Sequence, residues 1–218
     1  MTNTLLHVLA WTSGSLVSAE LLGYWLHRLL HSGVIGFLSR NHMRHHLVLY
    51  GPLQEQRSNE YQDATNDDAV ALGNIGVEWL IPAALLIAGA LWLFHIFHVP
   101  WPYQLIYFTV TLGWSFLMFS WLHDVMHVEE IWLAHNRWLN RWFLSARNLH
   151  DIHHFALNDH GLMDKNFGIG FFVLDRIFGT FAVKPQQFNN VGFRAAQQRF
   201  RFVLCEVKKP IRESFERP

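Results

Sequence analysis

The chain has 218 residues, of which 51% are hydrophobic and 15% are aromatic, and its 17 Lys and Arg residues balance its 17 Asp and Glu residues. The charge balance excludes a basic nucleic-acid-binding protein, the single cysteine excludes a disulfide scaffold and a cysteine-ligated iron–sulfur cluster, and the aromatic content excludes a disordered chain. Charged residues make up only 16% of the chain, against roughly 25% in an ordinary soluble domain, whereas histidine occurs 15 times.

The first predicted element is a membrane-spanning helix near the N-terminus. Glu20 is the only charged residue from Met1 to Leu26, and apolar residues dominate from Leu5 onward. A helix needs about 20 predominantly apolar residues to cross a bilayer, and this segment offers them. No cationic segment precedes the apolar residues, so we do not expect a cleaved signal peptide.

Two more spans are predicted in the middle of the chain. The 45 residues from Trp79 to His123 include no Lys, Arg, Asp or Glu. The sequence Val-Pro-Trp-Pro at 99–102 interrupts this run with a turn signal. We therefore expect one span at about Ile75–Phe97 and another at about Tyr103–Leu122. The alternative is a pair of buried core helices in a soluble protein, which so long an uncharged run disfavours.

Less apolar segments complete the predicted fold. Residues 51–74 are expected to form a polar, solvated loop, and residues 131–147 combine four aromatic side chains with three arginines, as in a helix at the membrane interface. Residues 166–183 are aromatic and rich in glycine but include an acid and a base, so we expect an interfacial or re-entrant segment. The chain then divides into a membrane domain at 1–183 and a polar, cytosolic C-terminal tail of the same domain at 184–218.

The positions of the positive charges predict the orientation in the membrane. All 17 Lys and Arg residues lie at 28–57, between the first and second spans, or at 137–217, after the third. Three spans place both segments on one side, which the positive-inside rule makes cytoplasmic. The sequence therefore predicts an all-α integral membrane protein with about three transmembrane helices plus interfacial helices, and with its N-terminus outside.

Ten of the 15 histidines fall into four clusters, with the spacings HxxxH, HxxHH, HxxxH and HxxHH in chain order. Residues three or four apart share a face of a helix, so each cluster offers two or three imidazoles to one metal ion or to two neighbouring ions. Histidine is the commonest metal ligand in proteins. The predicted metal ligands are His27, His31, His42, His45, His46, His123, His127, His150, His153 and His154.

The four clusters agree with the predicted orientation. Two of them lie at the cytoplasmic ends of the first and third spans, and each of the other two follows on the same side. Segments that are far apart in the sequence therefore converge on one face of the membrane. Because ten imidazoles exceed what one ion can bind, we expect a cytosolic, histidine-rich dimetal centre.

Other polar residues near the clusters are weaker candidates. Asp124 and Asp151 lie one residue away from the histidine face of their clusters, where each could accept a hydrogen bond from a ligating imidazole or be solvated. His160 is a candidate for an extra ligand. Glu20, an acid within a span, could orient His27, line a substrate passage or bond to another helix. Three histidines near the outer ends of the spans are expected to be interfacial rather than ligating: His7, His95 and His98.

The order of the clusters between the predicted spans resembles the fatty acid hydroxylase/sterol desaturase superfamily. The resemblance covers about residues 20–183 and includes the sequence Asn-Phe-Gly at 166–168 and Asp-Arg-Ile-Phe-Gly-Thr at 175–180. It implies a membrane enzyme in which the ten histidines hold two non-haem iron ions, which zinc can replace in purified protein. It also implies that dioxygen and two electrons oxidise an aliphatic C–H bond of a lipid such as a fatty acyl chain or a sterol, by hydroxylation or by desaturation.

The resemblance implies partners as well. These are a lipid substrate from the bilayer, dioxygen and an external electron donor, either a ferredoxin or a b-type cytochrome with its reductase, because the chain carries no flavin, haem or iron–sulfur motif. Some larger members have their own b-type cytochrome domain, for which 218 residues leave no room. We expect a bacterial inner membrane rather than an endoplasmic reticulum membrane, and no nucleic-acid partner.

Several alternatives remain open at this point. The nearest is a carotenoid hydroxylase of the same superfamily, although the first cluster in that branch usually has one more residue between its histidines than His27 and His31 have. A metal transporter would place polar ligands near the midplane of the membrane. A metallohydrolase of the membrane-peptidase type would need an HExxH sequence, and a bis-histidine haem protein would hold its histidines well within the spans. Histidine clusters at the ends of the spans favour the lipid-oxidising enzyme over the transporter and the haem protein.

Overall fold

The computed structural model describes residues 2–52, 80–184 and 187–204, and its regular elements there are helices, with one isolated β-bridge between Leu157 and Met163. The predicted loop at 51–74 therefore lies almost wholly outside the described residues. The helices, in chain order, are α1 (Thr2–Ser32), α2 (Gly36–Arg44), the π-helical η1 (His45–Leu49), α4 (Leu80–Ile96), α5 (Trp101–Ser115), the π-helical η3 (Phe116–Leu122), α6 (His123–Val125), α7 (Trp132–His135), α8 (Asn140–Phe155), α9 (Val173–Ile177), α10 (Asn190–Arg199) and α11 (Arg201–Leu204).

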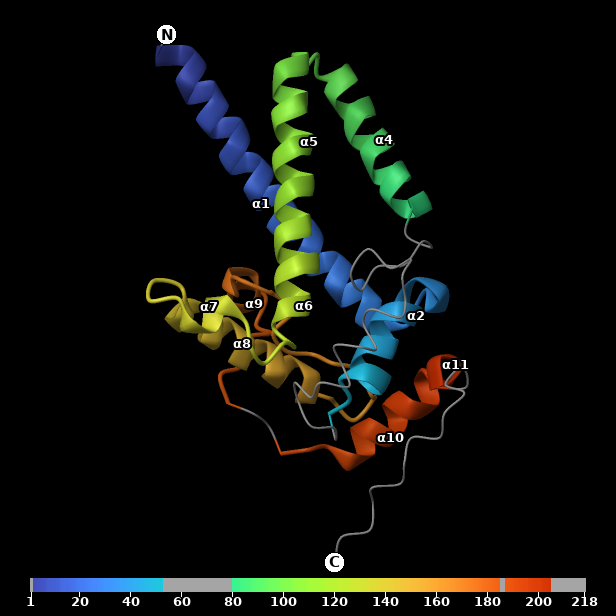
Figure 1. The fold of residues 1–218 in the computed structure, drawn as a ribbon. Helices are drawn as coiled ribbons and strands as arrows, with labels where there is room; N and C mark the ends of the chain where they lie inside the picture. The colour runs from blue at the N-terminus through green and yellow to red at the C-terminus, as the bar shows by residue number, and fades with distance from the viewer. Residues whose placement is uncertain (1, 53–79, 185–186, 205–218) are drawn as a thin grey trace, which may run out of the picture.

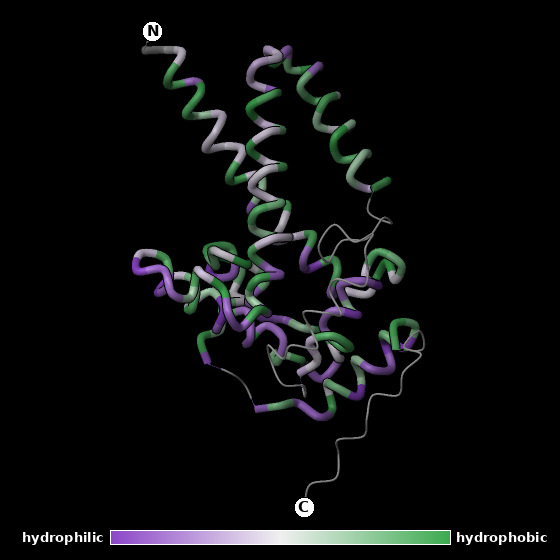
Figure 2. Tube along the Cα trace, viewed as in Figure 1, coloured by the Kyte–Doolittle hydropathy of each residue, from purple (hydrophilic) through white to green (hydrophobic). Residues whose placement is uncertain are grey.

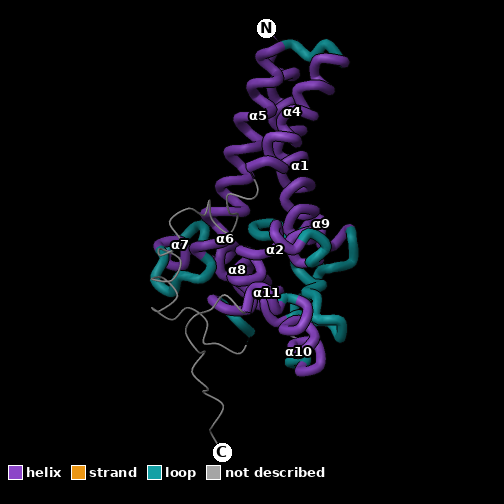
Figure 3. Tube along the Cα trace, turned by 90° about the vertical axis from the view of Figure 1, so that its right-hand side faces the viewer, coloured by secondary structure: helices purple, strands orange, loops and turns teal. Residues whose placement is uncertain are grey.

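The molecule has two parts, an elongated bundle and a base. Helices α1, α4 and α5 project together from a more compact group made of α2 and α6 to α11 (Figure 1; Figure 3). The projecting helices are mostly apolar along their length, whereas the base mixes polar and apolar residues (Figure 2). The all-helical fold that the sequence predicts is thus confirmed for the described residues.

Two continuous helices are long and apolar enough to cross a membrane. They are Thr4–Ser32, which has 29 residues, and Trp101–Val125, which has 25 residues and joins α5, η3 and α6. Helix α4 is apolar but has 17 residues, somewhat fewer than the roughly 20 that a bilayer requires. The start expected for this span, Ile75, lies outside the described residues, so the third span stays a prediction.

Small side chains let α1 and α5 cross closely. Ser15 and Ala19 are fully buried, and the ring of Phe119 covers Gly23, where an added Cβ would lie 2.1 Å from a ring carbon. Thr111 donates a hydrogen bond of 3.3 Å to the carbonyl of Ser15. Small residues four apart are what allows helix backbones to approach in a membrane, where helix packing rather than the hydrophobic effect holds helices together.

Helix α4 is attached to α5 at the end away from the base. The turn between them contains Pro100, which precedes the first residue of α5, as the turn signal predicted. Phe94 of α4 lies edge-on against Tyr107 and Phe108 of α5, with ring centroids 5.0 Å and 5.9 Å apart. No side chain of α4 is buried, so its outer face is free to contact lipid.

In the base, the helix expected at 131–147 is divided, and part of the predicted tail forms helices. Residues 131–147 are not one helix, because the side-chain oxygen of Asn136 accepts hydrogen bonds from the backbone N–H groups of Trp138 and Leu139 and so separates α7 from α8. The predicted polar tail includes α10 and α11, which pack against α2 and η1 through a buried cluster of apolar side chains. That cluster comprises Met43, Leu47, Leu157, Met163, Ala196, Phe200 and Val203.

The helix crossing makes a testable prediction about stability. Replacing Gly23 with Leu should force α1 away from α5 and lower the stability by about 1–3 kcal/mol, the usual cost of overpacking. Gly14 lies on the same helix with no atom within 4 Å of an added Cβ, so Gly14→Leu is the matched control. Thermal unfolding of both variants in detergent tests this, and equal losses of stability would contradict the close crossing.

Candidate metal centre

All ten predicted ligands lie close together in the base. The C-terminal end of α1 and the C-terminal end of the continuous helix α5–η3–α6 both reach this part of the molecule. Every one of these imidazoles is buried, with at most 4% of its surface exposed. His27 and His31 come from α1, and the second cluster comes from α2 and η1. The third cluster comes from α6 and the turn after it, and the fourth from α8.

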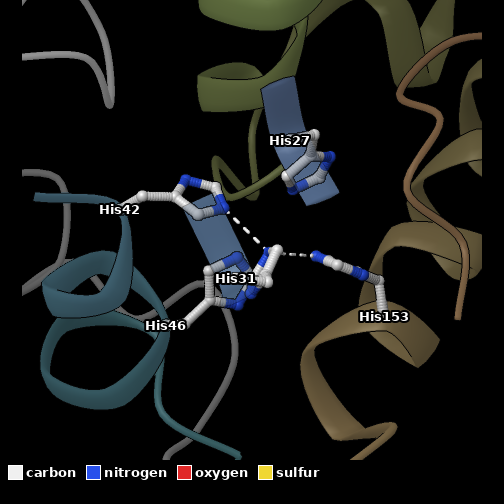
Figure 4. Close-up of side chains that lie close together, drawn as sticks. All are labelled: His27, His31, His42, His46 and His153. Carbon is white, nitrogen blue, oxygen red and sulfur yellow. Dashed lines mark hydrogen bonds between the residues drawn. The ribbon is translucent and has the colours of Figure 1, made fainter. Parts of the chain in front are cut away.

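Nine of the ten form two groups in which the candidate ligand atoms all lie within 4.8 Å of one another. The five-histidine group is His27, His31, His42, His46 and His153, and the four-histidine group is His45, His127, His150 and His154. Figure 4 shows the first group, whose side chains come from α1, α2, η1 and α8 and lie close together. Its closest nitrogen pairs are His31 to His42, at 2.9 Å, and His31 to His153, at 3.0 Å.

The two HxxHH clusters are each divided between the groups. In the first, His42 and His46 belong to the five-histidine group and His45 belongs to the other. In the last cluster the roles are reversed, since His153 joins the five-histidine group while its neighbour His154 joins the other. Each group therefore contains one histidine from the other half of the chain: His45 lies with three histidines of the second half, and His153 lies with four histidines of the first half.

His123, the tenth predicted ligand, lies beside the four-histidine group but outside it as defined by distance. Its ring centroid is 4.7 Å from that of His45 and 4.6 Å from that of His150, against 6.1 Å from that of His27. Its Nδ1 is 3.5 Å from a carboxylate oxygen of Asp124. The structure thus places both histidines of the third cluster next to the same centre as His150 and His154 of the fourth.

Two stretches of π-helix occur at the clusters. The first, η1, begins at His45, and the second, η3, ends immediately before His123. A π-helical turn holds more residues than an α-helical turn, and such turns are frequently found at functional sites. In both HxxHH clusters, including the one in the α-helix α8, the two histidines four residues apart share a group, and the histidine between them joins the other group.

The buried ring nitrogens suit a metal better than an empty core. Both ring nitrogens of His45 and of His46 lack a hydrogen-bond partner among the described residues, as do Nε2 of His27 and Nδ1 of His31. A buried polar atom without a partner is costly, and a bound ion would remove that cost. Burial, together with the neighbouring imidazoles, holds the pKa of His45 and His46 well below the ordinary value of 6.5, so both are in the neutral form that binds metals.

Backbone carbonyl groups orient three of the histidines. The ring N–H at Nδ1 of His27 donates to the carbonyl of Phe167 at 2.6 Å, and that of His153 donates to the carbonyl of Lys165 at 2.6 Å. Nδ1 of His154 donates to the carbonyl of Tyr50 at 3.1 Å. A hydrogen bond at Nδ1 fixes the tautomer and leaves Nε2 as the ligand atom. The carbonyl groups thus direct imidazoles from both groups inward.

Asp175 holds the loop that supplies one of these carbonyl groups. Its fully buried carboxylate accepts hydrogen bonds from the N–H groups of Phe167 and Gly168, at 2.7 and 2.8 Å, and from the hydroxyl of Thr180, at 2.7 Å. The segment predicted as interfacial or re-entrant therefore has a buried polar side against the site. It also has exposed apolar side chains such as Ile177. Sequence reasoning missed this role of Asp175, although an acid within an apolar, glycine-rich segment was a signal for it.

The weaker candidates lie outside both groups. His160 is exposed, and Asp124 and Asp151 are not among the grouped ligands. Glu20 accepts a hydrogen bond of 2.7 Å from the indole N–H of Trp114, which ties α1 to α5. The three histidines that were expected to be interfacial are also outside the groups: His7, His95 and His98.

An apolar cavity of about 390 Å³ lies between α1, α4 and α5 and reaches the site. Most of its walls are aliphatic or aromatic, but His27, His42 and His123 line it as well. The cavity therefore connects the membrane-facing helices with histidines of the metal centre.

Comparison with known proteins identifies one family. The sequence model of the family described as fatty acid hydroxylase matches residues 13–180, a range that includes all ten predicted ligands. Neither the comparison with curated proteins nor the comparison with solved structures found a match. The resemblance that the histidine clusters indicated is confirmed.

The two groups predict separable losses of metal. His46→Ala should lower metal binding at the five-histidine group, His154→Ala should lower it at the four-histidine group, and the double variant should lose both, because each removal leaves an incomplete set of ligands. His98→Ala, outside both groups, is the control. Metal analysis of the purified variants measures this, and a double variant with the metal content of either single variant would contradict two separate sites.

The hydrogen bonds of Asp175 predict a longer-range effect. Asp175→Asn cannot accept from both backbone N–H groups with the same pair of oxygens, so the loop should shift and His27 should lose its fixed orientation. We expect metal affinity to fall roughly 10- to 100-fold, as when other groups that orient ligands are removed. Glu130→Gln, at a side chain that is 85% exposed, is the control, and competitive metal titration is the measurement. Unchanged affinity would show that the loop holds His27 without the carboxylate.

Proposed function

The chain belongs to the fatty acid hydroxylase family, and we propose that it oxidises an aliphatic C–H bond of a membrane lipid, using two non-haem iron ions, dioxygen and electrons from an external donor. The observation that carries this proposal is the pair of buried histidine groups at the end of an apolar cavity. An apolar cavity suits a lipid, and nitrogen ligands without a thiolate suit redox-active iron.

The reaction fits the donor set of the site. Iron held by imidazoles supplies activation of dioxygen, which zinc, lacking redox chemistry, does not. In hydroxylation, one oxygen atom enters the C–H bond, while the other leaves as water with two electrons and two protons from outside the chain. In desaturation, two hydrogens leave the lipid, and both oxygen atoms become water with the same two external electrons. The electron donor is a separate protein, a ferredoxin or a b-type cytochrome with its reductase.

The protein's own residues bind, orient and exclude water. The histidines of the two groups would hold the ions, with His123 as a further ligand beside the four-histidine group. The carbonyl group of Lys165 keeps the imidazole of His153 in one tautomer, and the carbonyl group of Phe167 does the same for His27. The apolar walls of the cavity keep water away from the reacting carbon, which protects a reactive oxidant from side reactions.

The proposed orientation places the N-terminus outside and the histidines on the cytoplasmic side. It rests on the positions of Lys and Arg, which are absent from residues 1–27 and from the turn at 98–102. The arrangement suits a donor protein in the cytoplasm, because hydrophilic residues are concentrated in the base (Figure 2). A bacterial inner membrane is the proposed location.

Isotope labelling tests the reaction. Incubation of the enzyme with a reductant, a donor protein and isotopically labelled dioxygen should place one labelled oxygen atom on an aliphatic carbon of the lipid product. An unlabelled product that is lighter by two hydrogens would identify desaturation, which keeps the same site. Turnover that continues without dioxygen would overturn the oxidative mechanism and favour a hydrolase instead. Mass spectrometry of extracted lipids is the measurement.

Reporter fusions test the orientation. A reporter that is active only in the cytoplasm should be active when fused after Pro218 and inactive when inserted at Pro100 or placed before Thr2. The expected pattern follows from three spans with the positive charges inside. Activity at Pro100 would contradict the hairpin of α4 and α5, and activity at Thr2 would contradict the outer position of the N-terminus.

A further inference from the structure

We propose that two buried aromatic residues, Tyr50 and Phe167, are positioning residues, and that each of them supports the ligands of one metal site. Tyr50 supports the four-histidine group, and Phe167 supports the five-histidine group. The inference rests on metal binding at the two groups, which the proposed function requires, but it does not depend on which lipid is oxidised.

Tyr50 contacts three of the four histidines in its group. Its ring is stacked on that of His127, with the centroids 3.8 Å apart and the planes inclined by 14°. The centroid of the His45 ring lies 4.8 Å away and that of the His154 ring lies 6.4 Å away. The carbonyl group of Tyr50 accepts the hydrogen bond from Nδ1 of His154. The ring and the backbone of one residue therefore act on the same group of ligands.

The backbone holds Tyr50 in this place. Tyr50 directly follows η1, and its N–H donates a hydrogen bond of 2.8 Å to the carbonyl of His45, five residues earlier. Such a bond between residues five apart is the bond of a π-helical turn. Because the same turn carries His45 and Tyr50, the position of the ring is tied to that of a candidate ligand.

Phe167 repeats this arrangement at the five-histidine group. The centroid of its ring is 5.4 Å from that of His153, 5.7 Å from that of His27 and 5.8 Å from that of His31. Its carbonyl group accepts the hydrogen bond from Nδ1 of His27, and Asp175 accepts a hydrogen bond from its N–H. Here too, one buried residue packs its ring against three candidate ligands and orients one of them through its carbonyl group.

The two aromatic residues come from opposite halves of the chain. The four-histidine group takes three of its ligands from the second half, whereas Tyr50 lies in the first. The five-histidine group takes four of its ligands from the first half, whereas Phe167 lies in the second. Each ring therefore comes from the half that supplies only one histidine to the group that the ring supports. The repetition of this pattern at both groups distinguishes the two rings from ordinary core residues.

The stack of Tyr50 on His127 suits an imidazole that is bound to a metal. Neutral aromatic rings prefer offset or edge-to-face contacts, with centroids about 4.5–7 Å apart, to direct face-to-face contact. The centroids of these two rings are only 3.8 Å apart. A metal ion withdraws electron density from the imidazole that binds it, and the face of a phenol ring attracts positive charge. The contact is therefore stronger with a metal bound than without, so it contributes to metal affinity as well as to packing.

Variants with one intact group separate the two supports. His46→Ala leaves the four-histidine group intact, and His154→Ala leaves the five-histidine group intact. Tyr50→Leu should lower the affinity for Co²⁺ roughly 10- to 100-fold in the His46→Ala protein, as the loss of other groups that orient ligands does, and leave it unchanged in the His154→Ala protein. Phe167→Leu should give the opposite pattern. The measurement is titration of the metal-free full chain in detergent against a competing chelator, followed by the visible absorption of bound cobalt.

Two controls separate the ring contact from a general loss of stability. Tyr50→Phe keeps the ring and should keep the cobalt affinity of the four-histidine group. Phe200→Leu removes a buried ring from the apolar cluster that α10 and α11 form with α2 and η1. It should lower the thermal stability while the cobalt affinity of both groups stays the same.

A measurement on the natural ring makes the test independent of whether Tyr50→Leu folds. In protein labelled with fluorotyrosine, the fluorine NMR signal of Tyr50 is the one that Tyr50→Phe removes. Paramagnetic Co²⁺ shifts the signals of nearby nuclei most strongly. Added Co²⁺ should therefore shift this signal further in the His46→Ala protein, which keeps the four-histidine group, than in the His154→Ala protein.

Several outcomes would overturn the inference. Equal losses of affinity in the two backgrounds, or no loss in either, would show that Tyr50 and Phe167 do not support separate groups, and so would the loss of all cobalt from either background. If Tyr50→Phe binds cobalt as weakly as Tyr50→Leu, the ring contact is not the cause. A larger fluorine shift in the His154→Ala protein would contradict the pairing of ring and group. In all these cases the proposed function stands, whereas an unmodified protein that binds no cobalt would overturn the metal centre and the proposed function together.

Discussion

The structure depends on the burial of ten imidazoles around two centres. Each of these side chains is at most 4% exposed, and several ring nitrogens, including both of His45 and both of His46, have no hydrogen-bond partner among the described residues. Polar atoms in such a position cost free energy until something binds them. Neutral imidazoles that surround a centre could hold a metal ion, and metal binding to such a site contributes to folding. A bound metal ion would therefore stabilise the base.

The exchange of histidines between the two groups connects the two halves of the chain. His45 lies with ligands that come mostly from the second half, and His153 lies with ligands that come from the first half. Neither group can be complete until α8 has packed against α2 and η1. Backbone carbonyl groups of the loop at 165–167 and of Tyr50 then orient individual rings. Helix packing and loop structure thus together position the candidate metal ligands in the base.

The helices above the base form the cavity and also position candidate ligands. The close crossing of α1 and α5 at Ala19 and Gly23 brings the ends that carry His27 and His123 together. Helix α4, which has no buried side chain, completes the wall of the cavity instead of filling it. Membrane helices lack a hydrophobic driving force for tight packing, so a helix held at one end by Phe94 can leave the cavity open between it and its neighbours.

Much of this protein could be predicted from its sequence, because the governing patterns are local. A run of uncharged residues is long enough for membrane helices, and histidines three and four residues apart share a helix face, so the candidate metal ligands and the helical fold could be predicted from spacing. Within each HxxHH cluster the two histidines four residues apart share a group, as residues on one helix face do. Which group receives the middle histidine did not follow from spacing, since it depends on how α8 meets η1. The spacing of apolar residues also did not predict the break at Asn136, which its side-chain hydrogen bonds cause. Contacts between separate segments produce the packing of α10 and α11 around Phe200, the support that Asp175 gives to the loop at 167–168, and the cavity. Local patterns determine which side chains are present on each helix face, whereas only the packing of those helices decides which side chains meet.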